Sequence, residues 1–268
     1  MKGFIRKMKA ELGSPVNYQL PVGNELFDLN SCLGKTLTLS FSGQVQCINC
    51  ERPTKKSFSQ GYCYPCFKKL AACDLCIMKP ETCHYAAGTC REPAWGEANC
   101  MISHYVYLAN SSGLKVGITR HTQVPTRWID QGAIQALPIY KVNTRLDSGR
   151  LETTIGAMVA DKTNWRTMLK GEVEILDMKA RRDELLDRLK VSLQTLSDQG
   201  VGMERLEADV VEINYPVLEY PTKISSFNFD KNPVVEGTLM GIKGQYLIFD
   251  TGVINLRKFT AYDIEVQC

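Results

Sequence analysis

The central part of the chain alternates hydrophobic and polar positions with the period of β-strands. Short runs rich in Tyr, Val, Ile and Leu occupy 105–108 and 114–118, and the Ser-Ser-Gly at 111–113 predicts a tight turn between two antiparallel strands. A third hydrophobic run covers 134–142 and contains Pro138, which has no N–H to donate to a neighbouring strand. We therefore expect a third strand that is bulged at the proline or lies at the edge of the sheet.

Two helices are predicted beside these strands. Pro125 and Gly132 flank residues 126–131, a pattern typical of a helix with proline in its first turn and glycine just past its end. Ser148 is a suitable N-cap for a second helix through about Ala160, in which hydrophobic residues recur at the spacing of one helical face.

Other hydrophobic patterns predict the elements that precede and follow this central part of the chain. In residues 165–199, hydrophobic residues recur mostly every three or four positions among charges of both signs, which predicts one long amphipathic helix. Residues 203–268 change to short runs with a period of two, and residues 36–41 alternate in the same way. Because isolated strands need partners, we expect the two sets to pair in a small β-barrel or sandwich.

These patterns together predict an α+β protein. The length of 268 residues suits two domains, although one large domain is the alternative. The expected parts, in chain order, are an N-terminal β segment that pairs with C-terminal strands (1–46), a cysteine-rich zinc-binding region (47–102), a ββαβα domain (103–164), the long amphipathic helix (165–199) and a C-terminal β domain (203–268).

The composition is that of an ordinary globular protein, with 44% hydrophobic and 23% charged residues. No run is apolar enough to cross a bilayer, and the basic start of the chain lacks the apolar stretch of a signal peptide. We therefore expect a cytoplasmic protein without membrane contact. Thiols stay reduced in that compartment, which favours metal binding over disulfides for the 11 cysteines. A disulfide-rich secreted domain is the competing interpretation.

Nine of the cysteines lie between residues 47 and 100. Two Cys-x-x-Cys motifs about a dozen residues apart can turn four thiolates toward one tetrahedral zinc ion, which leaves no open position for catalysis. This spacing predicts a structural zinc site at Cys47, Cys50, Cys63 and Cys66.

The remaining cysteines of the region offer a second site, together with the nearby His84 and His104, but their spacing does not select four ligands. These cysteines are Cys73, Cys76, Cys83, Cys90 and Cys100. A second zinc ion is the preferred interpretation, and an iron–sulfur cluster is the alternative for thiolates at irregular spacing. Cys32 and Cys268 are expected to be free thiols.

The order strand, strand, helix, strand, helix in residues 103–160 resembles the fold of the GIY-YIG nuclease superfamily. The resemblance is carried by Tyr105-Val106-Tyr107, Lys115-Val116-Gly117, Arg127 on the next helix and Glu152 on the following one. Tyr105 occupies the place of the first glycine and Lys115 that of the second-motif tyrosine; minimal branches of the superfamily carry a similar Lys-hydrophobic-Gly version. The whole order, cysteines first and this motif afterwards, is also similar to a prokaryotic family catalogued as a domain of unknown function.

The resemblance implies cleavage of phosphodiester bonds. It implies that Tyr107 activates water, that Arg127 holds the phosphate and that Glu152 binds one Mg²⁺ or Mn²⁺ ion, with Arg120 as a second phosphate contact; Tyr105 and Lys115 complete the candidate catalytic residues. The chemistry is reasonable because a transition state with charge spread over phosphate oxygens needs a fixed cation, a metal ion and a proton acceptor. Each residue also has an ordinary explanation, since tyrosines commonly pack on sheets and a helix dipole favours glutamate in an early turn.

We therefore predict a zinc-binding protein that cleaves nucleic acid, DNA or RNA, without a small-molecule cofactor. Residues 1–100 carry 12 Lys or Arg against 8 Asp or Glu, and residues 201–268 carry 6 against 10, so the basic excess lies toward the start of the chain. One alternative is a module that binds nucleic acid without cutting it, through the zinc region and lysines such as Lys55 and Lys56. Another is a protein–protein adaptor. The oligomeric state stays open.

Overall fold

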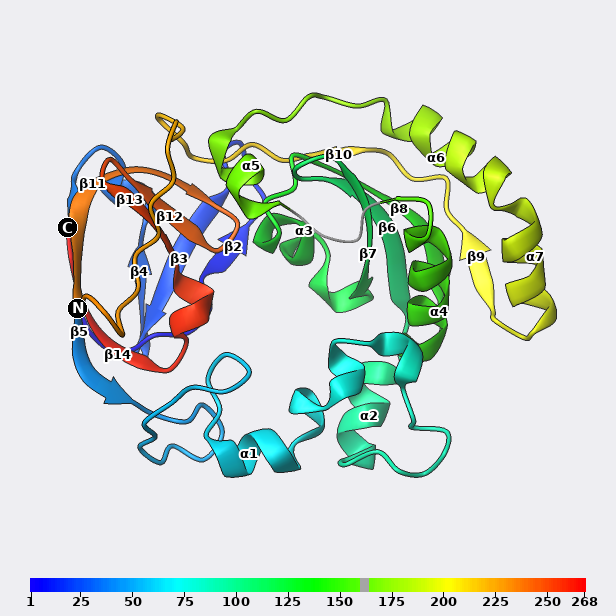
Figure 1. The fold of residues 1–268 in the computed structure, drawn as a ribbon, viewed down its shortest axis with the longest axis horizontal. Helices are drawn as coiled ribbons and strands as arrows, with labels where there is room; N and C mark the ends of the chain where they lie inside the picture. Colours follow the sequence, from blue (N-terminus) through cyan, green and yellow to red (C-terminus); the bar gives the residue numbers. More distant parts are fainter. Residues whose placement is uncertain (160–163) are drawn as a thin grey trace. The chain divides into compact units, whose positions relative to one another are not determined.

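The computed structural model describes residues 1–159 and 164–268 (Figure 1). Ala160, the predicted end of the second helix, lies outside these ranges, and the observed helix covers Arg145–Gly156. The described residues form seven α-helices and three β-sheets, which confirms the predicted mixed α+β class. The chain divides into two compact units. The first consists of Met1–Lys68, Leu169–Gly171 and Ile213–Cys268, and the second of Lys69–Met168 and Glu172–Glu212. The cysteine-rich region is therefore divided between the two units.

The first unit contains a six-stranded antiparallel sheet in the order β1-β14-β5-β11-β12-β13 and a three-stranded sheet in the order β2-β3-β4. The strands of the larger sheet are β1 (Lys2–Phe4), β5 (Thr36–Val45), β11 (Val234–Lys243), β12 (Tyr246–Phe249), β13 (Gly252–Asn255) and β14 (Tyr262–Gln267). Those of the smaller sheet are β2 (Lys9–Glu11), β3 (Asn17–Val22) and β4 (Glu25–Asp28).

The strand β5 holds this unit together. It pairs with β11 on one side and β14 on the other, so strands from the start of the chain are hydrogen-bonded to strands from its end. Leu37 and Leu39 share one face of β5 and are fully buried, as the alternation of hydrophobic residues predicts. Among the described residues, β1 and β13 do not pair with each other, so the sheet is open and the expected barrel is wrong.

Both chain ends lie in the first unit, where β1 pairs with β14 and the Met1 amino group donates to the Val266 carbonyl at 2.9 Å (Figure 1). Cys268 follows β14 and Cys32 precedes β5, and a disulfide joins these two cysteines across a Cα–Cα distance of 6.0 Å. The expectation that Cys32 and Cys268 are free thiols is therefore wrong. The pairing of β14 with β5 brings the two thiols together, and no local pattern reveals contact between residues so far apart in the sequence.

The second unit is built on the antiparallel sheet β10-β8-β6-β7, with β9 also paired to β8. Its strands are β6 (His104–Asn110), β7 (Leu114–Arg120), β8 (Gln135–Val142), β9 (Met203–Arg205) and β10 (Val211–Glu212). Its helices are α2 (Pro93–Cys100), α3 (Thr126–Asp130), α4 (Arg145–Gly156), α6 (Met178–Arg188) and α7 (Lys190–Asp198), whereas α1 (Tyr64–Lys69) and α5 (Trp165–Lys170) each contain a boundary between the units.

The main core of the second unit lies between one face of the sheet and the helices α4, α6 and α7. Val106 and Leu108 of β6 point into it and pack with side chains such as Leu151, Ile155 and Leu185 from the helices. Tyr105 and Tyr107 alternate with these residues, so they occupy the opposite face of the sheet. The predicted hairpin of β6 and β7 is confirmed.

The pairing of β6 with β8 shifts register beside Pro138, which confirms the bulge that was one of the two expected arrangements; β8 is an inner strand of the sheet. Two other details of the predicted second-unit elements need correction. The helix α4 is capped by Thr144, whose hydroxyl accepts the Asp147 N–H at 3.1 Å, rather than by Ser148. The single long helix expected at 165–199 is instead α5, α6 and α7, because the chain leaves the helical conformation at Gly171, where φ is +73°.

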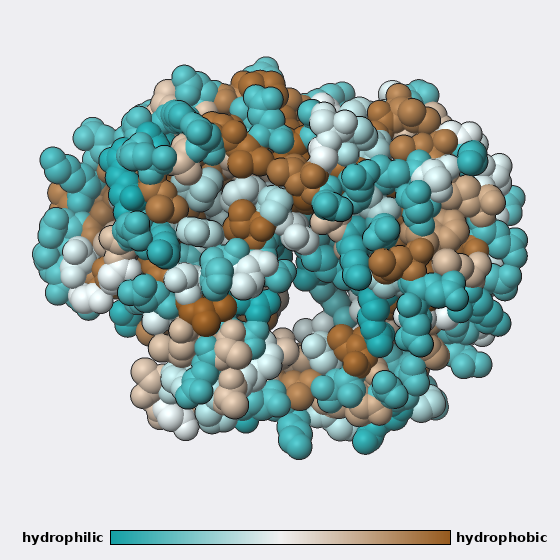
Figure 2. Space-filling model, turned by 180° about the vertical axis from the view of Figure 1, so that it is seen from behind, coloured by the Kyte–Doolittle hydropathy of each residue, from teal (hydrophilic) through white to brown (hydrophobic). Residues whose placement is uncertain are grey.

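The exterior of the described residues gives little further indication of function. No helix among them combines the length and the hydrophobicity that a membrane span requires. On the face shown in Figure 2, hydrophilic residues surround separate patches of hydrophobic ones. Large hydrophobic side chains are exposed on different elements, for example Met78 and Val191, and scattered exposure of this kind is common on protein surfaces.

Candidate functional site

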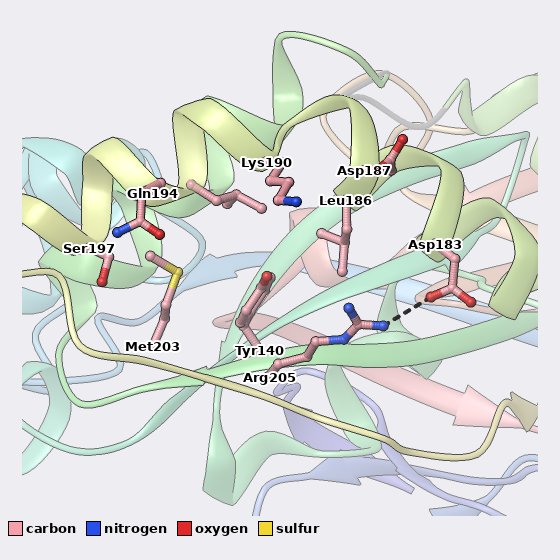
Figure 3. A pocket seen from close by; sticks show the side chains of 10 residues that line it. Tyr140, Asp183, Leu186, Asp187, Lys190, Gln194, Ser197, Met203 and Arg205 are labelled. Atoms are coloured by element: carbon pink, nitrogen blue, oxygen red, sulfur yellow. Dashed lines mark hydrogen bonds and ion pairs between the residues drawn. The ribbon is translucent and has the colours of Figure 1, made fainter.

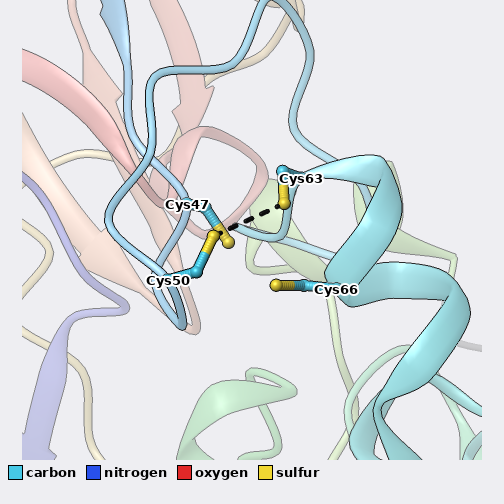
Figure 4. A group of neighbouring side chains, drawn as sticks. All are labelled: Cys47, Cys50, Cys63 and Cys66. Carbon is cyan, nitrogen blue, oxygen red and sulfur yellow. Dashed lines mark hydrogen bonds between the residues drawn. The ribbon is translucent and has the colours of Figure 1, made fainter.

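Four cysteines of the first unit converge as the sequence predicts (Figure 4). Cys47 and Cys50 lie in the turn that follows β5, and Cys63 and Cys66 lie at the start of α1. Their sulfur atoms all lie within 4.8 Å of one another, and the Cys50 and Cys63 sulfurs are 3.7 Å apart. A tetrahedral zinc ion with Zn–S bonds of 2.3 Å would separate its sulfur ligands by roughly 3.8 Å. The geometry of the four cysteines therefore fits one metal ion.

A backbone hydrogen bond joins the two segments that carry these four cysteines. The Ile48 N–H donates to the Gly61 carbonyl at 2.8 Å, which joins the turn carrying Cys47 to the loop before Cys63. Gly61 has a φ of +131°, a conformation that favours glycine, and a Cβ there would lie 2.7 Å from the Ile48 side chain. The Asn49 amide also donates to the Cys66 sulfur at 3.4 Å, so the loop supplies an outer contact to one ligand.

The thiols of this cluster influence each other's ionisation. Burial opposes ionisation of Cys47, but backbone hydrogen bonds from Cys63, Cys50 and Asn49 outweigh it and lower the Cys47 pKa to about 6. Burial, together with the neighbouring thiols, raises the pKa of Cys66 to about 12 although Asn49 opposes this. Four adjacent thiolates repel one another, and a divalent cation at their centre removes this repulsion.

The remaining cysteines lie in the second unit. Cys76, Cys83, Cys90 and Cys100 line one small enclosed cavity, whereas Cys73 is buried outside its lining. Burial, together with the negative charges of Cys83, Cys76 and Cys90, raises the pKa of Cys100 to about 11, although the charge of Arg145 opposes this. His84 also lines the cavity, but His104 does not.

The phenol of Tyr107 lies on the face of the sheet opposite the main core. Its side chain is fully buried, with the Trp128 ring edge-on at a centroid distance of 5.9 Å, and its hydroxyl donates to Oε1 of Gln131 at 3.0 Å. Gly117 faces Tyr107 across the β6–β7 pair, and a Cβ at Gly117 would lie 2.7 Å from the phenol oxygen. The close approach of the Tyr107 phenol therefore explains why residue 117 is a glycine.

Charged groups from the two helices α3 and α4 act on the Tyr107 phenol and on Lys115, which lies on the same face of the sheet. Burial is the main reason that the pKa of Tyr107 rises to about 12, while the charge of Arg127 lowers it and that of Glu152 raises it. Burial, together with the charge of Arg127, lowers the pKa of Lys115 to about 8, although the charge of Glu152 opposes this. The charges of Arg127 and Glu152 thus act on both Tyr107 and Lys115. We term these four residues the Tyr107 cluster, namely Tyr107 of β6, Lys115 of β7, Arg127 of α3 and Glu152 of α4.

Two other candidate catalytic residues lie apart from the Tyr107 cluster. Tyr105 shares a face of β6 with Tyr107, but it lines a surface hollow with residues of the 206–208 segment. Arg120 lies on the opposite face of β7 from Lys115, and its guanidinium donates to the side chain of Asn99. The catalytic roles expected for Tyr105 and Arg120 therefore stay predictions.

A family model described as "Protein of unknown function (DUF2797)" matches residues 34–264. The chain belongs to this family. No curated protein and no solved structure matches the chain. The predicted membership of a family of unknown function is thereby confirmed, whereas the likeness to GIY-YIG nucleases stays a prediction. The matched segment contains both cysteine groups and the Tyr107 cluster.

Some residues around these groups had no signal in the sequence. Gln131 and Trp128 contact Tyr107 from α3, and their role depends on which face of that short helix is turned to the sheet. Arg145 binds the carbonyls of Cys76 and Ile77, at 3.3 and 2.7 Å. An arginine in the first turn of a helix has no local motif that would identify these partners.

A larger pocket of the second unit lies away from the Tyr107 cluster, between α6, α7 and the strands β8 and β9 (Figure 3). Arg205 and Asp183 form an ion pair at 3.1 Å at one side of it, and Tyr140, Lys190 and Gln194 line the remainder. No residue of the Tyr107 cluster lines this pocket. This pocket and the candidate catalytic residues therefore lie in different parts of the unit.

Proposed function

We propose that the chain cleaves phosphodiester bonds in nucleic acid at the Tyr107 cluster, in a protein stabilised by structural zinc. The observation that supports the proposal is the electrostatic influence of the Arg127 guanidinium and the Glu152 carboxylate on both the buried Tyr107 phenol and the buried Lys115 amine. This set matches the residues that the likeness to GIY-YIG nucleases implies, in the same order along the chain.

Glu152 is the residue that would hold a Mg²⁺ or Mn²⁺ ion. Its side chain belongs to a half-buried residue of α4, and a carboxylate is a ligand that these hard cations prefer. One protein carboxylate is enough where waters and substrate phosphate oxygens supply the other ligands, as is common for Mg²⁺. The bound ion would neutralise the negative charge that develops on the phosphate oxygens.

The charges of the cluster favour Lys115 as the proton acceptor. The Tyr107 phenol has a pKa of about 12 and donates its hydrogen bond to Gln131, so at neutral pH it holds its proton and fixes the geometry. Lys115, with its pKa lowered to about 8, is partly a neutral amine near neutral pH. The role that the family likeness gives to Tyr107 is therefore proposed for Lys115.

In the proposed reaction a water oxygen bonds to phosphorus while its proton passes to the Lys115 amine. The bond from phosphorus to the leaving oxygen breaks with its electron pair on that oxygen, which then takes a proton from solvent. Arg127 holds two phosphate oxygens through its planar fork, so that the developing charge is balanced without reorganisation of water.

The four cysteines of the first unit support a separate structural role. We propose that Cys47, Cys50, Cys63 and Cys66 bind zinc, because Zn²⁺ favours four thiolates at the sulfur separations observed here. Four protein ligands leave no position for a substrate. Of the hydrophobic residues between 47 and 66, only Cys47 and Cys63 are buried, so the ion would take the place of a hydrophobic core in this segment.

A binding function without cleavage is the second candidate, and the burial of the cluster favours it. Tyr107 is fully buried and only 5% of Lys115 is exposed, so a polyanion would reach the cluster mainly through the half-buried Arg127 and Glu152. Such a protein would bind phosphates with a strong dependence on salt.

The two candidates separate in one experiment. Zinc-loaded protein is incubated with supercoiled DNA, single-stranded DNA and structured RNA in Mg²⁺ or Mn²⁺, and both binding and cleavage are measured at low salt. We expect cleavage of at least one substrate by the wild type and a loss of about 10²-fold or more in Arg127→Ala, the range for removal of a charge-stabilising group. The control is Arg150→Ala, an exposed arginine on α4. Binding without any cleavage would support the second candidate, and absence of both would reject the two together.

A further inference from the structure

The second unit holds five thiols that the first metal cluster does not use, and four of them line one cavity. Cys76 lies in the 3₁₀ turn Leu75–Ile77, Cys83 directly follows the turn Pro80–Thr82, Cys90 lies in the loop before α2, and Cys100 is the last residue of α2. All four line the same enclosed cavity. None of them forms a disulfide, and each is buried or half-buried.

Other donors near this cavity already have partners. The two ring nitrogens of His84 lie 2.8 Å from the Thr89 hydroxyl and 3.5 Å from the Asp74 carboxylate. Asp74 in turn pairs with Arg91 at 2.7 Å and accepts the Leu75 N–H at 2.6 Å. One ligand atom from each of Asp74, Cys76 and His84 lies within 4.8 Å of the other two, so Asp74 and His84 are the competing donors. Their contacts with Arg91 and Thr89 favour the thiols of the cavity as ligands.

We propose that Cys76, Cys83, Cys90 and Cys100 bind a second zinc ion and that Cys73 is not a ligand. Four thiols that line one small, closed cavity suit a tetrahedral ion, and the cavity has no room for an organic ligand. Gly96 of α2 fits this arrangement, because a Cβ there would lie 3.2 Å from the Cys90 sulfur and 2.7 Å from the Tyr85 ring. The small residue lets α2 approach the cavity closely.

The proposed ion has a structural consequence within the same unit. The guanidinium of Arg145, in the first turn of α4, donates to the backbone carbonyls of Cys76 and Ile77. One turn further along α4, the backbone of Pro80 and Glu81 lies so close to Gly149 that no Cβ would fit. The segment from Cys76 to Cys83 thus forms the surface on which the first half of α4 packs. An ion bound by both its ends would hold it in place.

The site itself does not depend on the proposed function. Its link to catalysis, through Glu152 on α4, rests on that function. Failure of the metal site and failure of cleavage are distinguishable because the metal is measured directly.

The test compares the zinc content of the full-length wild type with that of three variants. We expect about two ions per wild-type chain, from four ligands per ion. Cys83→Ser with Cys90→Ser should retain one, Cys50→Ser with Cys63→Ser should retain the other, and the matched control Cys73→Ser should retain both. Amide hydrogen exchange in α4 should become faster in the Cys83/Cys90 variant and stay unchanged in the Cys73 control. One ion in the wild type, or loss of an ion in Cys73→Ser, would overturn the assignment.

A second measurement covers the case in which the Cys83/Cys90 variant does not fold. Wild-type protein is treated with an alkylating reagent before and after chelation of its metal, and the modified cysteines are identified by peptide mass. We expect Cys76, Cys83, Cys90 and Cys100 to be protected together and to become reactive together. Reaction of these four before chelation, under conditions in which Cys47 and Cys50 stay protected, would refute the second site.

Discussion

Replacement of Gly117 by alanine should destabilise the protein, whereas the same replacement at Gly156 should not. A Cβ at position 117 would lie 2.7 Å from the Tyr107 oxygen and 2.8 Å from its Cζ atom, well inside the ordinary contact distance of about 3.5–4.0 Å. Tyr107 has little room to move away, because its ring is fully buried beside Trp128 and its hydroxyl is bonded to Gln131. Overpacking of this kind costs about 1–3 kcal/mol.

The control variant, Gly156→Ala, should change the stability in the opposite direction or leave it unchanged. A Cβ at Gly156 meets only a methyl group of Val116, at an ordinary 3.7 Å, and the residue lies in α4. Alanine is favoured over glycine in a helix by up to about 1 kcal/mol, so Gly156→Ala should be neutral or stabilising. Neither glycine has a positive φ, so the difference between the two variants reports the contact with Tyr107.

Thermal unfolding at a fixed zinc concentration measures both variants, because a bound metal also shifts Tm. The expected cost lowers Tm by roughly 2–12 °C for a chain of this size. Adding Tyr107→Phe removes the oxygen nearest to the new Cβ, so the two effects should combine less than additively, with a coupling of about 0.5–3 kcal/mol. Equal stability of the Gly117 and Gly156 variants, or strict additivity with Tyr107→Phe, would show that the phenol and Gly117 are not in contact.

Three further outcomes are expected. The cleavage rate should rise with pH and level off above about 8, since Lys115 accepts a proton only as the neutral amine; a pH–rate profile measures this, and Lys115→Arg should abolish the rise. Stability should fall as pH drops from about 6.5 toward 4, because burial lowers the pKa of His104 to about 4 and the unfolded chain takes up the proton first; the full effect is roughly 3 kcal/mol, and His104→Gln should reduce the pH dependence of urea unfolding. Denatured, metal-free protein should titrate 9 thiols without reductant and 11 after reduction; 11 in both cases would exclude the Cys32–Cys268 disulfide.

The sequence predicts best where local pattern and local structure coincide. The hairpin of β6 and β7, the short helix α3 and the strand β5 follow from alternation and from glycine and proline positions, which act within a few residues. The helix expected at 165–199 fails because hydrophobic spacing continues across residues that leave the helix at Gly171. The cap of α4 was predicted at Ser148 because serine and threonine are both good caps, and only the structure selects Thr144.

Long-range contacts set the limit for the functional sites. The four cysteines Cys47, Cys50, Cys63 and Cys66 are predicted because each Cys-x-x-Cys turn already directs two thiols to one point. Cys83, Cys90 and Cys100 belong to no Cys-x-x-Cys motif, and the cavity that they line with Cys76 depends on how α2 and two 3₁₀ turns pack. For the Tyr107 cluster, the family likeness suggests the residues, but the burial that favours Lys115 over Tyr107 as proton acceptor requires the structure.

The central claim, that the Tyr107 cluster cleaves phosphodiester bonds, is tested most directly by replacing Glu152. Initial rates of cleavage in Mg²⁺ or Mn²⁺ are compared for wild type, Glu152→Gln and the control Glu172→Gln, an exposed glutamate outside the cluster. We predict that Glu152→Gln loses about 10²-fold or more of the activity while Glu172→Gln retains it. Equal rates in the two glutamate variants, or no cleavage by the wild type on any nucleic acid, would contradict the claim.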